Sequence, residues 1–255
     1  MRREKIRIAA AQFPVSDSIK KNVRYIQNQI EKAANQDATV VQFPETALPG
    51  YAPKHFDTLK EYAWDDLKRY ERHICGLASS FGIWVILGSM RQVDGELPKI
   101  SMYVISDRGD VMGVYDKRRL YGKEKEMFSP GSKPCVVKIN GYKCGFLICY
   151  ENCFPELYDE YRDMGVELVF HSFYNAANRG ATSIKDLMVA SLMVRAADNQ
   201  MWISASNSSK SYSPLSACIV RPDGSLIRAR RNVTGLVVDN YPSNDLGWTY
   251  NNRII

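Results

Sequence analysis

The stretch GFLICYE at residues 145–151 passes from an apolar segment to polar and charged residues. Its apolar part is a short continuous run, typical of a strand buried on both faces, and a helix is expected to begin near Pro155. Cys149 therefore lies at a strand-to-helix junction, where a side chain can be exposed at a sheet edge while its backbone stays rigid. A lone cysteine is more often a small buried residue, so Cys149 needs partners before it can be interpreted as a nucleophile.

Short apolar runs and helical patterns alternate on both sides of this stretch. We predict strands at residues 6–13, 38–43, 83–88, 102–106, 111–115, 135–139, 144–148, 167–171, 201–205, 217–221 and 235–238. Helices are predicted from Asp17 or Ser18 to about Asn35, in the amphipathic segment 57–81, at 150–164 and at 184–199. The turn sequences DRGD at 107–110 and NG at 140–141 predict hairpins. Strands in pairs with helices between the pairs favour stacked sheets covered by helices.

The composition indicates one α/β domain spanning residues 1–255. The chain has 255 residues, of which 45% are hydrophobic and 24% charged, enough for one large core. No compositional boundary, linker or repeat divides it. The formal net charge is +6, but most basic residues alternate with acidic ones, so nucleic-acid binding is not predicted.

The distribution of apolar residues and cysteines predicts a cytoplasmic protein. Arg7 and Gln12 interrupt the first apolar stretch, and no uncharged apolar run reaches the roughly 18 residues that a membrane span needs. We therefore predict neither a signal peptide nor a membrane contact. The six cysteines are scattered, mostly within apolar runs, which predicts free thiols and no disulfides.

Histidine is the usual partner of a nucleophilic cysteine, but the three histidines, His55, His73 and His171, stand in no pattern that recommends them. His171 ends a predicted strand and so can line a pocket. A Cys-His acyltransferase or peptidase stays open as an alternative, since it requires only one histidine near Cys149.

Two charged residues at strand ends are further candidates. Glu45 follows the predicted buried strand 38–43, and burial would raise its pKa and make it a usable base near neutral pH. Lys117 follows the predicted strand 111–115. Taken singly, each is more often a solvated surface residue, so neither segment alone assigns a function.

Three blocks, taken together, resemble the signature blocks of the nitrilase (carbon-nitrogen hydrolase) superfamily in their usual order. They are FPET at 43–46 with PGY at 49–51, YDKRRL at 115–120, and GFLICYE at 145–151 with FPEL at 154–157. IAAAQF at 8–13 and RAADN at 195–199 extend the resemblance over nearly the whole chain. It implies a four-layer αββα sandwich with a catalytic triad of Glu45, Lys117 and Cys149.

The resemblance also implies a second site glutamate before a Phe-x-Pro-Gly turn. The segment KEKEMFSPG at 123–131 offers Glu124 and Glu126, and the spacing favours Glu124. The residues expected to bind the substrate are Tyr51, Tyr150, His171, Tyr174 and Asn175. The chain departs from the usual pattern at Asp116, Arg119 and Glu151, where arginine, histidine and aspartate are common, and none of these changes removes a triad member.

The implied chemistry is acyl transfer through a thioester on Cys149, with Glu45 as base and an oxyanion stabilised by Lys117 and a backbone N–H near residue 150. The ammonium of Lys117 is expected to lower the pKa of the thiol. The substrates expected are water and a small amide or N-carbamoyl (ureido) compound, with no metal or organic cofactor. Nitrile hydrolysis and a catalytically silent scaffold are the alternatives.

Assembly is also inferred from the resemblance. Superfamily members are commonly oligomeric, which implies a homodimer or larger homo-oligomer. The segment from Tyr241 on has little periodicity, and we expect it to run irregularly over the surface or onto a partner.

Overall fold

Two six-stranded sheets form the centre of the molecule. The computed structural model describes residues 4–242 and 246. The strand order is β12-β1-β2-β3-β4-β5 in the first sheet and β11-β10-β9-β8-β7-β6 in the second. The strands are β1 (Ile6–Gln12), β2 (Val40–Gln42), β3 (Trp84–Arg91), β4 (Lys99–Ile105), β5 (Val111–Asp116), β6 (Val136–Ile139), β7 (Tyr142–Ile148), β8 (Leu168–Ser172), β9 (Trp202–Ser206), β10 (Cys218–Val220), β11 (Leu226–Arg228) and β12 (Gly235–Tyr241).

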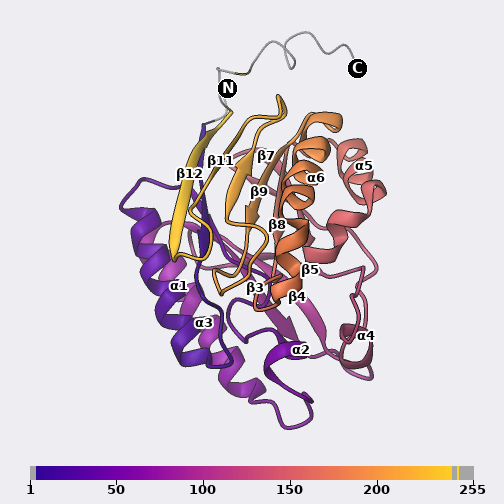
Figure 1. Ribbon diagram of the computed structural model, residues 1–255. Helices are drawn as coiled ribbons and strands as arrows, with labels where there is room; N and C mark the ends of the chain where they lie inside the picture. The colour runs from indigo at the N-terminus through magenta and orange to yellow at the C-terminus, as the bar shows by residue number, and fades with distance from the viewer. Residues whose placement is uncertain (1–3, 243–245, 247–255) are drawn as a thin grey trace.

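Helices cover the outer face of each sheet, which gives the predicted αββα sandwich (Figure 1). On one side α1 packs against α3 and contacts β2 and β12, and on the other α6 contacts β9 and β10, with α5 beside it. The helices are α1 (Ile19–Ala34), α2 (Ala52–His55), α3 (Trp64–Phe81), α4 (Glu124–Met127), α5 (Pro155–Asp163) and α6 (Lys185–Asp198), with 3-10 turns η1 (Cys149–Cys153) and η2 (Arg179–Ile184). None of these helices of the described chain is long and apolar enough to cross a bilayer.

The middle strands of both sheets are parallel and carry the residues of interest at their carboxyl ends. β2 pairs in parallel with β1 and β3, and β8 with β7 and β9. Every residue of β2, β8 and β9 is buried, as expected for strands covered on both faces. Glu45 follows β2 and Cys149 follows β7, so both leave their sheets at strand ends.

A small polar network joins the two sheets. Gln42 Nε2 donates to Ser172 Oγ (3.1 Å), and Ser204 Oγ donates to Gln42 Oε1 (2.6 Å). Ser172 Oγ in turn donates to the carbonyl oxygen of Phe43 (2.7 Å). Because buried polar groups that are paired fix one arrangement of a core, this network holds the end of β2 against β8. Glu45 continues the contact, since its N–H donates to the carbonyl oxygen of Phe173 (3.2 Å).

Both predicted hairpins are confirmed, as is the first helix. β4 pairs with β5 and β6 with β7 in antiparallel register, and Asn140 and Gly141 have the positive φ values of a two-residue hairpin turn. Helix α1 is capped by Ser18, whose side chain accepts from Lys21 N (3.4 Å). It buries the apolar face predicted from its spacing.

Some element bounds differ from the predictions. The amphipathic segment 57–81 is helical only from Trp64, and in the non-helical stretch before it Thr58 Oγ1 accepts from Lys60 N (3.2 Å). The strand predicted at 235–238 extends to Tyr241, since β12 pairs with β1 as far as Ile6. The rest of the expected irregular C-terminal segment lies outside the described residues, apart from 242 and 246.

Of the free cysteines, Cys153 is exposed.

Candidate active site

Cys149 occupies a strained turn at the end of β7. It is the first residue of η1, and its φ is +48°, an uncommon value for a residue other than glycine. Such backbone conformations persist only where the surroundings hold them, and they cluster at active sites. The local geometry is therefore that of a nucleophile presented at a sheet edge.

Glu151 holds this turn in place. Its buried carboxylate accepts from Ile148 N (2.6 Å) through Oε2, and from Tyr115 OH (2.8 Å) and Arg118 N (2.6 Å) through Oε1. Tyr115 and Arg118 lie on either side of Lys117 in the sequence. The Glu151 side chain therefore connects the turn that carries Cys149 to the chain around Lys117. The sequence predictions included Glu151 only as a departure from the usual pattern. The available signal was a carboxylate three residues after a buried strand.

The structure brings Lys117 between two carboxylates. Lys117 Nζ lies 2.6 Å from Glu45 Oε1 and 2.7 Å from Glu124 Oε1, and all three side chains are fully buried. Glu45 Oε2 accepts from Tyr174 N (3.0 Å), and Cys149 Sγ lies 4.0 Å from the Tyr174 carbonyl oxygen. Strand ends from both sheets thus meet at one point, with a thiol, two carboxylates and an ammonium group.

Burial dominates the electrostatics of this cluster. It raises the pKa of Glu45 to about 7, although the charge of Lys117 and hydrogen bonds from Lys117 and Cys149 lower it. Burial alone would lower the pKa of Lys117, but the two carboxylates outweigh it and raise that pKa. Lys117 is therefore a permanent cation, while Glu45 exchanges a proton near neutral pH.

Lys117 lowers the pKa of the Cys149 thiol, as expected, but the net shift is upward. Burial and the charges of Glu45 and Glu124 outweigh the lysine and hold that pKa well above the usual value. The resting thiol is therefore protonated and needs an adjacent base to become a nucleophile.

A cavity of about 540 Å³ opens onto the cysteine. The residues predicted from the sequence that line it are Cys149, Glu124, Tyr51, Tyr150, Tyr174 and Asn175. Tyr51 donates to Glu124 Oε1 (2.7 Å), and its ring stacks on that of Tyr174 at 4.6 Å between centroids. Glu126, the alternative to Glu124, is exposed. The cavity thus reaches Cys149 and Glu124, while Glu45 and Lys117 lie buried behind them and are not among its lining residues.

Comparison with known proteins identifies the family of this chain. The sequence profile described as Carbon-nitrogen hydrolase matches residues 7–247. This chain belongs to the carbon-nitrogen hydrolase family. Nitrilase homolog 2 from Dictyostelium discoideum is 27% identical over 216 residues, which cover 80% of this chain and 63% of that protein. An omega-amidase from Xenopus tropicalis is 27% identical over 212 residues, 80% of this chain and 74% of that protein.

Solved structures show the same fold. An amidase from Nesterenkonia sp. superimposes with a TM-score of 0.83 at 23% identity, covering 99% of this chain and 95% of its own. A mutant of that amidase has the acetamide moiety of fluoroacetamide covalently added at its active-site cysteine, with a TM-score of 0.82 at 24% identity over 93% of this chain and 90% of its own. The chain spans less than two thirds of several matched relatives, including 26% of a glutamine-dependent NAD+ synthetase from Thermotoga maritima.

The histidines of this carbon-nitrogen hydrolase make no hydrogen bond to the thiol in the described residues, although His171 bonds to the backbone of Cys149. His171 is fully buried beneath the turn, its Nδ1 lies 2.7 Å from Tyr158 OH, and it is not among the residues lining the cavity. His55 Nδ1 accepts from Tyr51 N (2.9 Å), and burial lowers its pKa to about 4. His73 is exposed on α3. Within the described chain, no histidine side chain is hydrogen-bonded to the thiol of Cys149, so the Cys-His alternative lacks its contact.

The residues that form the far wall of the cavity were not predicted from the sequence. It consists of side chains from the segment after β8, from η2 and from α6: Ala176, Asn178, Ile184 and Met188. No pattern marks these residues, because they come together only when η2 and α6 fold over the strand ends. Asn152 and Cys153 of η1 complete the side nearest the nucleophile.

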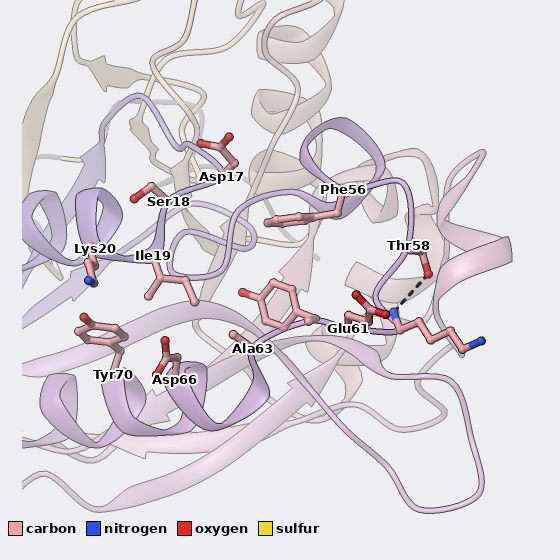
Figure 2. A pocket seen from close by; sticks show the side chains of 12 residues that line it. Asp17, Ser18, Ile19, Lys20, Phe56, Thr58, Glu61, Ala63, Asp66 and Tyr70 are labelled. Atoms are coloured by element: carbon pink, nitrogen blue, oxygen red, sulfur yellow. Dashed lines mark hydrogen bonds between the residues drawn. The ribbon is translucent and has the colours of Figure 1, made fainter.

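A second cavity, of about 610 Å³, lies between the start of α1 and the start of α3 (Figure 2). Phe56, Ile19 and Tyr70 contribute apolar surface, and Asp17 and Asp66 lie at its edge. None of the triad residues lines it, nor does any cysteine or histidine. In the described part of the chain, no group of three or more His, Cys, Asp or Glu side chains is arranged to hold a metal ion.

Proposed function

We propose that this carbon-nitrogen hydrolase cleaves the C–N bond of a small amide or N-carbamoyl compound through an acyl-enzyme on Cys149. The observation that carries the proposal is the buried Lys117 ammonium held 2.6 Å from Glu45 and 2.7 Å from Glu124, near a protonated thiol that lines a cavity of about 540 Å³. The covalent acetamide adduct at the cysteine of the Nesterenkonia amidase supports the same chemistry.

The first half-reaction forms the thioester. Ionised Glu45 accepts the thiol proton as Cys149 Sγ attacks the substrate carbonyl carbon, and Lys117 stabilises the developing oxyanion. The Tyr150 N–H, which has no intrahelical acceptor because it lies in the first turn of η1, donates to the same oxygen. When the intermediate collapses, protonated Glu45 gives its proton to the leaving nitrogen, and ammonia or an amine departs.

The second half-reaction restores the enzyme. Glu45, again ionised, removes a proton from water, whose oxygen attacks the thioester carbonyl. Collapse expels the Cys149 thiolate, which takes back the proton from Glu45. The product that leaves is a carboxylic acid from an amide, or carbamic acid, which breaks down to CO2 and ammonia, from an N-carbamoyl compound. Glu124 keeps Lys117 and Tyr51 in place through both halves, since its Oε1 accepts from each of them.

Ammonia release identifies the reaction. Wild-type protein is incubated with a panel of primary amides, N-carbamoyl amino acids and nitriles, and ammonia is measured against heat-denatured protein. We expect release from at least one amide or N-carbamoyl compound, with a stoichiometric acid product. If folded protein released no ammonia from the amides or the N-carbamoyl compounds, or released it from nitriles alone, the proposal would be contradicted.

The rate should depend on pH through Glu45. Its carboxyl must be ionised to accept the thiol proton, and its pKa is about 7. We therefore expect kcat/KM to be constant above pH 7 and to fall about tenfold per pH unit below it. The measurement is a kcat/KM profile from pH 5 to 9 on the best panel substrate. Glu45→Gln has no carboxyl to titrate, so its residual activity should lack this acid limb; an identical limb in the variant would assign the pKa to another group.

Homo-oligomerisation and a cytoplasmic location remain predictions. Light scattering at micromolar concentration tests the first of them.

A further inference from the structure

One histidine lies directly behind the aromatic wall of the active-site cavity. His55 is the last residue of α2 and is not among the described residues that line the cavity, whereas Tyr51 and Tyr174 are. Its Nδ1 accepts from Tyr51 N (2.9 Å), and its Nε2 lies 3.3 Å from Tyr174 OH. One imidazole therefore contacts both of the tyrosines that form this wall.

These contacts determine which ring nitrogen carries the hydrogen. A backbone N–H only donates, so Nδ1 has a free lone pair, and the neutral ring carries its hydrogen on Nε2, which donates to the Tyr174 hydroxyl oxygen. Lys210 Nζ also lies 3.1 Å from Nε2, but an ammonium cannot donate to a nitrogen that carries a hydrogen. Burial lowers the pKa of His55 to about 4, with help from the charges of Lys210 and Lys54 and against that of Asp17. The ring is therefore neutral at neutral pH.

Gly50 leaves room for this ring. Its φ is +90°, and a Cβ at this position would lie 2.9 Å from His55 Nδ1 and 2.5 Å from the Ser16 carbonyl oxygen. A side chain there would displace the imidazole from Tyr51 N or strain the turn. The glycine before Tyr51 and the histidine four residues after it thus form one local unit.

Each of the two tyrosines supports one carboxylate of the site. Tyr51 OH donates to Glu124 Oε1 (2.7 Å), and Tyr174 N donates to Glu45 Oε2 (3.0 Å). The two tyrosine rings stack at 4.6 Å between centroids. His55 therefore lies where the supports of the two carboxylates meet.

We propose that His55 is a positioning residue for amide hydrolysis, which keeps Glu124 and Glu45 oriented through Tyr51 and Tyr174. This inference rests on the proposed function and adds to it a residue that lies behind the cavity wall. Misplacement of a reacting group by about 1 Å can cost about a hundredfold in rate. Loosening the two tyrosines should therefore lower kcat although no group that lines the cavity is removed.

The first test replaces the two ring nitrogens separately. The side-chain oxygen of asparagine can take the place of Nδ1 and accept from Tyr51 N, whereas the amide of the longer glutamine reaches the place of Nε2. On the best panel substrate we expect kcat to fall roughly tenfold to a hundredfold in His55→Ala, with little change in KM. His55→Asn should recover most of this loss and His55→Gln less, because the contact to Tyr51 N is the shorter one.

The matched control is His73→Ala, at an exposed position on α3, which should keep the wild-type kcat. Wild-type kcat in His55→Ala, or equal losses in the alanine and asparagine variants, would overturn the inference.

A double-mutant cycle tests whether the effect passes through Tyr51. Tyr51→Phe keeps the backbone and the ring but lacks the hydroxyl that reaches Glu124. We expect His55→Ala to lower kcat much less in the Tyr51→Phe background than in wild type. A loss of folded protein would lower kcat by the same factor in both backgrounds, so equal factors would assign His55 a purely structural role and contradict the proposal.

A measurement on wild-type protein does not depend on the folding of a variant. In a long-range proton–nitrogen correlation spectrum of protein with labelled histidines at pH 7, His55 should show a neutral ring with its hydrogen on Nε2. A hydrogen on Nδ1 would exclude the contact to Tyr51 N. Each contrary result, obtained with wild-type protein that turns over an amide or N-carbamoyl compound, leaves hydrolysis standing. Absence of turnover across both groups would overturn the proposed function, and this inference with it.

Discussion

Lys117→Met is expected to abolish amide hydrolysis and to lower the free energy of unfolding by about 3–5 kcal/mol at pH 8. The ammonium contacts Glu45 and Glu124 in a fully buried cluster, so its removal leaves two carboxylates close together with no cation. The two carboxylates must then either stay ionised in a buried site without a counter-charge or take up protons. A protonated Glu45 is no longer a base. The same change also removes the charge that stabilises the oxyanion.

Two measurements on this variant separate catalysis from folding. Chemical denaturation at pH 8 gives the change in the free energy of unfolding. Ammonia release at pH 8 without denaturant gives the activity, measured on protein that circular dichroism shows to be folded. Lys138→Met, at an exposed position on β6, is the control and should match wild type in both. A folded Lys117→Met protein with wild-type turnover would remove the lysine from the mechanism.

Cys149→Ala is expected to reduce kcat by about four orders of magnitude or more, because no covalent intermediate can form. Stability should change little, since the side chain lines the cavity and its sulfur lies 4.0 Å from the Tyr174 carbonyl oxygen, so the variant loses a weak contact there and the hydrogen bond to Glu45. Turnover is measured as ammonia release from the best substrate of the panel, and stability as the thermal midpoint.

Cys135→Ala provides the matched control. Cys135 is also a half-buried free thiol, but it lies before β6 and does not line the cavity. We expect it to keep the wild-type rate. Equal loss of activity in both variants would point to a general effect of cysteine removal, and full activity in Cys149→Ala would rule out a covalent route through this residue.

The elements around the site were predictable where one short range of sequence decided them. Asn140-Gly141 determines a hairpin turn by itself, and the apolar runs before Glu45 and Cys149 mark strands buried on both faces. The αββα arrangement and the triad, by contrast, followed from the resemblance of three blocks taken together. Glu45 alone looks like a solvated loop carboxylate.

The remainder depended on contacts between distant segments. The raised pKa of Cys149 arises from burial and from Glu45 and Glu124, which are more than 20 residues away in sequence. The lowering by Lys117 was predicted, but these larger opposing contributions were not visible in the sequence. Helix α3 starts at Trp64, later than the amphipathic pattern of 57–81 predicted. The orientation of Asn175 depends on Asn207, 32 positions later, which no local pattern reveals.

The central claim is that an acyl group is transferred from an amide to Cys149. Its most direct test is rapid acid quench of wild-type protein during turnover of the best substrate, followed by intact mass measurement and peptide mapping. We predict a mass increase of one acyl group, located on the peptide that contains Cys149 and absent from Cys149→Ala. Turnover with no adduct on any peptide in wild type, or an adduct that persists in Cys149→Ala, would contradict the account.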